Sequence, residues 1–68
     1  MENPMRNRIR QRIAETGKTM EDASVYIGMN RGYVYDFLQE RSDKIRFNLV
    51  PKLAEFFQCD PRYLTGEI

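Results

Sequence analysis

Polar side chains of three kinds gather in the stretch RGYVYD, from Arg31 to Asp36, where a guanidinium, two phenols and a carboxylate occur within six residues. These groups can exchange hydrogen bonds and form ion pairs. Covalent catalysis is not expected, because the chain has no histidine and a single cysteine, Cys59. A nucleophile–histidine pair is excluded, and a zinc site is not expected. We therefore predict a protein that is not an enzyme and that holds no metal and no cofactor.

The length of the chain bounds what it can build. A chain of 68 residues forms one domain and buries only about 60% of its extended surface, which leaves room for one small core and no deep substrate chamber. No apolar run reaches the roughly 20 residues of a membrane span, and a lone cysteine cannot form an internal disulfide. The sequence predicts a single cytoplasmic domain, residues 1–68, with no membrane segment and no small-molecule substrate.

The net charge of +1 conceals a segregation of charge along the chain. Residues 1–18 carry net +3 and residues 41–52 another +3, whereas residues 19–40 carry −3 and residues 53–68 carry −2. A basic surface can be an electrostatic footprint for nucleic acid, and it can equally be an ordinary solvated surface. Charge alone leaves both interpretations open.

Helix signals run through the whole chain, and no period-two strand pattern competes with them. Each expected helix has a capping residue, an apolar stripe or a glycine stop. The expected helices are one from the Asn3-Pro4 cap to Gly17, one from the Thr19 cap to Gly28, one built on Val34, Phe37 and Leu38, one with Asn48 as its cap and Pro51 in its first turn, and a short one from Asp60-Pro61 to Gly66. The sequence predicts an all-α domain of five helices.

A break in the helical pattern at Gly28 is followed at once by a new helix. Gly28 can adopt the left-handed conformation that ends a helix, and Asn30 can cap the next one. Ser24, a small residue on the inner face, lets the two helices approach closely. Two short helices joined by such a turn form a helix-turn-helix unit, which we predict over about residues 19–39.

The helix after the turn, about residues 30–39, directs its apolar stripe inward and its polar residues outward. A helix exposed in this way fits the major groove of DNA, which is about 12 Å wide, with its N-terminal end leading. The residues expected on the exposed face are Arg31, Gly32, Tyr33, Tyr35, Asp36 and Gln39.

The stretch TMEDASVYIGMNRGYV, residues 19–34, resembles the helix-turn-helix of the Cro and phage-repressor class, also called the xenobiotic-response-element family. The tail KLAEFFQCDPRYLTGE, residues 52–67, is similar to the fourth and fifth helices of that family. The resemblance covers about residues 5–66. It implies a compact five-helix repressor-like fold, sequence-specific DNA binding, and a role as a transcriptional regulator, most simply a repressor.

The resemblance also implies roles for individual residues. Arg31 and Gly32 match the first exposed positions of the family's recognition helix, and Tyr35 and Asp36 match later groove-facing ones. Contacts to base edges are expected from Arg31, Gly32, Tyr33, Tyr35 and Asp36. Contacts to the DNA backbone are expected from Asn30, Gln39, Arg41, Lys44 and Lys18.

A second interpretation stays open: a protein-interaction module on the same fold that has lost DNA binding. It fits the small net charge, the acidic Asp36, and Met20, which stands where the family often has glutamine. In that case the tyrosines would form an aromatic patch for a protein partner, and Arg41 and Lys44 would belong to a solvated loop. An enzyme is a distant third possibility, because a fold alone confers no chemistry.

The expected partners are double-stranded DNA and a second copy of the chain. One small helix-turn-helix has limited affinity, and palindromic half-sites mirror two-fold protein symmetry, so a homodimer on a palindromic operator is predicted. Binding to duplex DNA would depend steeply on salt, which separates this prediction from a protein-only adaptor.

Overall fold

A computed structural model describes residues 3–68, and this part of the chain contains helices and no strand. The prediction of an all-α domain with five α-helices is confirmed. None of the helices in the described residues is long and apolar enough to cross a membrane. The elements are α1 (Pro4–Thr16), α2 (Met20–Tyr26), α3 (Tyr33–Leu38), a 3-10 helix η1 (Phe47–Leu49), α4 (Val50–Phe57) and α5 (Pro61–Thr65).

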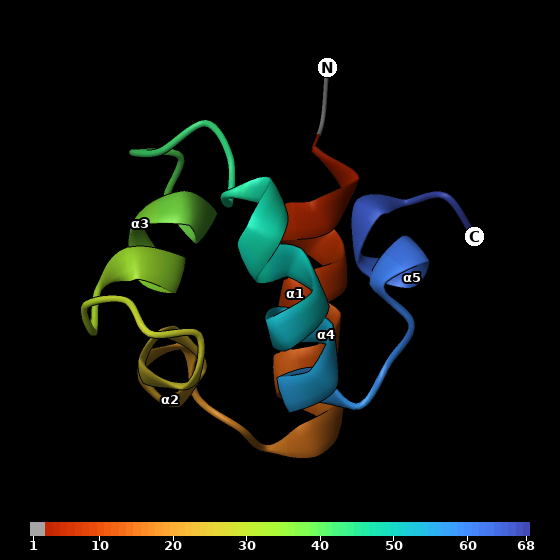
Figure 1. Cartoon of the computed structure of the whole chain (residues 1–68), viewed down its shortest axis with the longest axis horizontal. Coiled ribbons are helices and arrows are strands. Elements are labelled where there is room, and N and C mark those ends of the chain that lie inside the picture. Colours follow the sequence, from red (N-terminus) through yellow and green to blue (C-terminus); the bar gives the residue numbers. More distant parts are fainter. Residues whose placement is uncertain (1–2) are drawn as a thin grey trace.

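The helices pack around a central pair. Figure 1 shows α4 in front of α1, with α2 and α3 together on one side and α5 on the other. Every helix contributes to one apolar core, so α2 and α3 are held as a unit against the rest of the domain. The buried apolar residues are Ile9, Ala23, Ile27, Val34, Phe37, Leu38, Ile45, Leu49, Val50, Leu53, Ala54, Phe57 and Leu64.

Two predicted N-caps, Asn3 and Thr19, are present, and Asp60, where the last helix was predicted to start, is a third N-cap. The side chain of Asn3 accepts from Met5 N, that of Thr19 from Asp22 N, and that of Asp60 from Arg62 N, at 2.9, 3.0 and 2.8 Å. Each bond satisfies a backbone N–H that has no partner inside its helix.

The cap predicted at Asn48 differs from the structure. Asn48 lies inside η1, whose turn is closed by a bond from Leu49 N to Arg46 O (2.9 Å), and Leu49 occupies the N-cap position of α4. Because η1 runs directly into α4, Asn48 has no free helix end to cap. Pro51 lies in the first turn of α4, as predicted.

Gly28 ends α2 with a positive φ of 83°, as predicted. Met29 N donates to Ser24 O and Gly28 N to Val25 O, both at 3.0 Å, which is the Schellman pattern of helix termination. At the ends of α3 and α4 the same left-handed conformation is taken by residues with a side chain, Glu40 (φ 63°) and Gln58 (φ 57°).

The basic N-terminal segment is used inside the fold. The arginines of α1 and the lysine that follows it donate to carbonyl oxygens in the last turns of α3, α4 and α5. Such carbonyls lack the N–H partner four residues ahead that carbonyls inside a helix have, and they carry the negative end of the helix dipole, so cations stabilise them. The bonds join Arg6 Nε to Phe37 O (2.7 Å), Arg8 Nη1 to Tyr63 O (3.3 Å), Arg10 to Leu38 O, Arg12 Nε to Phe57 O (3.2 Å), and Lys18 Nζ to Phe56 O.

Candidate nucleic-acid interface

A buried serine joins α2 to α3. The hydroxyl of Ser24 donates to Met20 O and accepts from Val34 N, both at 2.9 Å, and Ser24 has no exposed surface. Val34 N lies in the first turn of α3, where backbone N–H groups have no helical acceptor. The Ser24 side chain therefore fixes the N-terminal end of α3 against α2.

Helix α3 begins later than predicted. The expected helix covered about residues 30–39, whereas α3 spans Tyr33–Leu38. Asn30 does not cap the helix directly; its side chain accepts from Gly32 N (3.0 Å) and its carbonyl from Tyr33 N (3.1 Å). These two bonds form a tight turn, so Asn30 and Arg31 lie in the connection and Gly32 is the N-cap.

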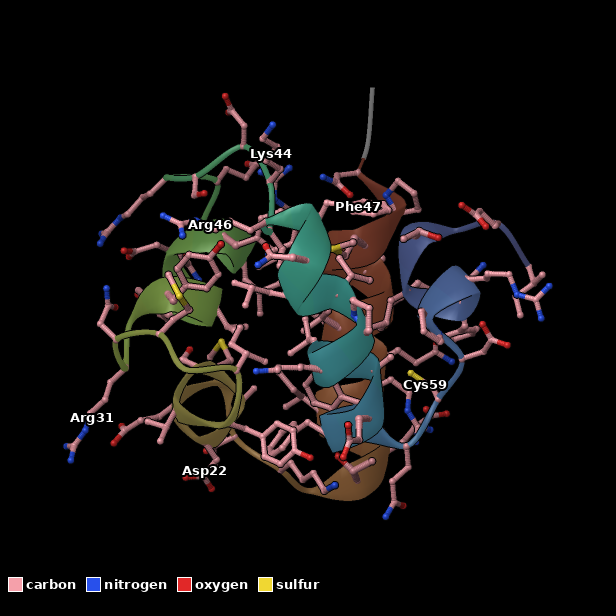
Figure 2. All side chains as sticks on the ribbon, in the orientation of Figure 1. Asp22, Arg31, Lys44, Arg46, Phe47 and Cys59 are labelled. Carbon is pink, nitrogen blue, oxygen red and sulfur yellow. The ribbon has the colours of Figure 1, made fainter. Side chains whose placement is uncertain are left out.

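Arg31 projects from this turn into solvent with 80% of its side chain exposed, and Figure 2 shows it at the end of α3 that lies beside α2. Its guanidinium is 3.5 Å from the Glu21 carboxylate, in the first turn of α2. An ion pair this exposed is weak and breaks readily. Arg31 is thus available to a ligand, although any anion must compete with Glu21.

Tyr35, Asp36 and Arg41 form a second exposed group on α3 and just after it. Arg41 lies 3.7 Å from the Asp36 carboxylate and 5.8 Å from the centre of the Tyr35 ring. Tyr35 itself is 41% exposed. Asp36 thus faces the Arg41 cation, and its charge at this surface is partly balanced.

Tyr33 occupies a different position from its predicted neighbours. It is half-buried against the core, and its hydroxyl accepts from Arg46 N at 3.1 Å. The phenol therefore connects α3 to the segment before η1. The sequence analysis predicted that Tyr33 lies on the exposed face. Its contact with Arg46 could not be predicted, because the two residues are 13 positions apart in the chain.

The segment between α3 and η1 carries the free cations of this surface. The side chains of Lys44 and Arg46 are exposed, and within residues 3–68 neither makes an ion pair or a hydrogen bond. Figure 2 shows both near the end of α3 that is farther from Arg31. Lys44 was predicted here; Arg46 was missed, although it belongs to the same basic segment.

The remaining predicted residues lie in varied settings. Gln39 is exposed at the C-terminal end of α3, and Gly32 is half-buried without a side chain of its own. Lys18 differs most, because its ammonium donates to Phe56 O and lies 4.7 Å from the Phe56 ring centre. That ammonium is held at the end of α4. Met20 packs against the core.

One further side chain escaped the sequence prediction. Phe47 is 90% exposed, more than any other large apolar residue of the described chain. Phenylalanine is one of the residues most often buried, so its residue type offered no signal of this exposure.

Cys59 has the surroundings of an inert thiol. It is half-buried between α4 and α5, and burial raises its pKa above the ordinary 9.0, against the opposing influence of the nearby Arg12. The thiol is therefore protonated near neutral pH. Residues 3–68 hold no group of three or more histidine, cysteine, aspartate or glutamate side chains placed to bind a metal ion.

Comparison of the chain with protein-family models, curated proteins and solved structures finds no match. The exposed residues of α3 and its flanking segments are therefore the basis on which a function can be inferred.

Proposed function

We propose that this protein is a sequence-specific DNA-binding regulator, with α2, the turn and α3 acting as a helix-turn-helix of the repressor type. Helix α3 would enter the major groove, with Arg31 and Tyr35 facing base edges. Lys44 and Arg46 would contact phosphates beside the groove. Two copies would bind the two halves of a palindromic site, in keeping with the two-fold symmetry of such complexes.

One observation carries the proposal: the exposed residues around α3 combine a side chain that can contact base edges with cations that can contact phosphates. Arg31 is at one end of α3, and Lys44 and Arg46, which are unpaired within residues 3–68, are near the other. The Ser24 bond to Val34 N holds the start of the helix in place. Fixed orientation matters because a base-reading side chain gains specificity only when its backbone is positioned.

The distribution of charge also supports a limited set of phosphate contacts. The first basic segment bonds helix ends within the fold, so it adds little to an external binding surface. Within residues 3–68, two exposed cations without a partner, Lys44 and Arg46, lie together in the segment just after α3. A protein with few phosphate contacts should show a modest salt slope, since each contact contributes about 0.9 to it.

A second candidate function is a protein-interaction module. It is favoured by the two carboxylates at the same surface, Glu21 beside Arg31 and Asp36 beside Arg41, which repel phosphate. The exposed Tyr35 ring would then contact a protein partner.

Selection of bound duplexes from a random library, followed by affinity measurements against salt, tests the proposal. We expect enrichment of a short, two-fold symmetric sequence and a falling affinity as salt rises. The Lys44→Ala, Arg46→Ala double variant should flatten the salt dependence. Lys52→Ala removes an exposed cation from α4, outside the proposed surface, and is the matched control. Absence of enrichment, with salt-independent or undetectable binding, would favour the protein-interaction module.

A further inference from the structure

Phe47 presents an almost fully exposed ring at the start of η1, beside a hollow between α4 and α5. The hollow has a volume of about 220 Å³ and is lined largely by apolar atoms. Its walls include Pro51 of α4 and Pro61 and Thr65 of α5, and Phe47 forms one rim. A projecting aromatic ring and a hollow of apolar lining thus lie next to each other on one face, which we name the Phe47 face.

We propose that a second copy of this chain docks on the Phe47 face, each copy inserting its Phe47 ring into the hollow of the other. A two-fold contact requires that one surface complement itself, so that a projection and its recess occur on the same molecule. The Phe47 face meets this requirement. If the exposed ring bound an unrelated protein, the recess for it would lie on that protein, and none would be required on this chain.

Charge favours a second copy over other occupants. Two of the residues that line the hollow are charged, Arg62 and Glu67, and Arg62 forms an ion pair with Asp60 at 3.0 Å. Arg46 precedes Phe47, and Glu67 lines the hollow. Reciprocal insertion brings the exposed Arg46 side chain of each copy towards the Glu67 carboxylate of the other, and neither group forms an ion pair within residues 3–68, so the two charges attract each other across both halves of the interface.

The size of the contact indicates a weak dimer. A phenylalanine ring buries roughly 150–250 Å² when it is enclosed, so two rings supply only part of a stable interface. Contacts that bury less than about 1,200 Å² in total are weak and transient. The dimer would form partially in free solution and more fully where two copies are held on adjacent half-sites, a consequence that rests on the proposed function.

The location of the Phe47 face suits such an arrangement. Figure 2 shows Phe47 over η1 and away from Arg31, which projects on the α3 side. Phe47 and α3 belong to neighbouring parts of the chain, joined by the Tyr33 bond to Arg46 N. A dimer through Phe47 therefore leaves Arg31 of both copies uncovered.

The test is nuclear magnetic resonance of the free protein over a dilution series, without DNA. We expect concentration-dependent shifts at the Phe47 ring, Pro51 and Thr65, and intermolecular contacts between the ring and the hollow in a sample of mixed isotope labelling. Phe47→Ser should raise the dissociation constant at least about tenfold, the effect of losing a central aromatic anchor. Glu67→Lys should weaken association by replacing attraction with repulsion. Val25→Ser, which removes a 56% exposed apolar side chain from α2, is the control and should associate as the parent does.

The outcomes are distinct. No concentration dependence, shifts that map elsewhere, or a Phe47→Ser protein that associates normally would each overturn the proposal. A Phe47→Ser protein that associates normally yet loses affinity for a single half-site would instead assign the ring to DNA. Dimerisation of a protein that binds no duplex would support the Phe47 contact while refuting the proposed function.

Discussion

The hydroxyl of Ser24 accepts a hydrogen bond from the backbone N–H of Val34 at 2.9 Å, with both residues fully buried. The same hydroxyl donates to Met20 O, so it bonds backbone groups both as a donor and as an acceptor. One side chain therefore completes the end of α3 and joins it to α2. The orientation of α3, on which the proposed function depends, is coupled in this way to the stability of the core.

Ser24→Ala should lower the free energy of unfolding by about 1–3 kcal/mol, because Val34 N would be left buried without an acceptor. Chemical denaturation of parent and variant measures the change. Ser42→Ala removes a hydroxyl that donates to Lys44 O in an exposed segment, and it should cost far less. Equal effects of the two substitutions would show that the Ser24 bond contributes nothing particular.

Gly28→Val should destabilise the domain by about 1–2 kcal/mol or more, because φ at this residue is +83° and a β-branched side chain fits that conformation worst. Empty space surrounds the position, since a Cβ there would meet no atom within 4 Å. The cost is therefore conformational and not a clash. Gly32→Ala is the control, because Gly32 has φ −92° and an added Cβ would make ordinary contacts. Thermal unfolding of both variants decides, and equal melting points would contradict the prediction.

Local features of the sequence were the ones that could be predicted. The caps Asn3 and Thr19, the start of the last helix at Asp60-Pro61 and the turn at Gly28 depend on residues within a few positions of one another, so the pattern of residue types is sufficient. The cap predicted at Asn48 is wrong for a local reason as well, because η1 runs directly into α4 and leaves no free helix end at Asn48.

Contacts between distant segments could not be predicted. Arg8 bonds a carbonyl 55 residues away and Arg6 one that is 31 residues away, so their use at helix ends depends on packing that no spacing encodes. The half-buried position of Tyr33 could not be predicted for a similar reason, because its hydroxyl contacts Arg46 N, 13 residues further along the chain. The exposed face of α3 was therefore predicted in outline. Which cations bond carbonyls inside the fold and which remain available to a ligand could be known only from the structure.

Acid should destabilise the N-terminal end of α5. Asp60 accepts from Arg62 N and from its guanidinium, and these hydrogen bonds hold the pKa of Asp60 below its ordinary 3.8. A lowered pKa in the folded state means that the stabilisation is complete above the ordinary value and is lost as pH falls through the lowered one. Asp60→Asn keeps an N-cap but cannot titrate, so its melting point should converge on that of the parent as the medium becomes acidic. A constant difference at every pH would contradict this.

Lys44→Ala should weaken binding to all duplexes alike and reduce the salt slope by about one unit, the expected loss of a single phosphate contact. The ammonium is exposed and unpaired within the described residues, so its removal costs the fold nothing. Affinity for the selected sequence and for an unrelated duplex, each measured across a range of salt, gives the result. A change in the preferred sequence would instead make Lys44 a base-reading residue.

Arg31→Ala should relax the sequence preference at one base position of each half-site and cost roughly 1–3 kcal/mol of binding free energy, the range for a lost base contact. The side chain is 80% exposed and its ion pair with Glu21 is long at 3.5 Å, so the fold should keep its melting point. Repeating the library selection with the variant measures the preference at each position.

Glu21→Gln is the companion variant to Arg31→Ala. It releases the guanidinium from its carboxylate and removes a negative charge from the same surface, so affinity for duplex DNA should rise while the preferred sequence stays unchanged. In the double variant the Glu21 substitution should raise affinity less than it does alone, because part of its effect requires Arg31. An Arg31→Ala protein that selects the same sequence as the parent would remove Arg31 from base recognition. A Glu21→Gln gain of equal size with and without Arg31 would show that the carboxylate acts on DNA directly and not through the ion pair.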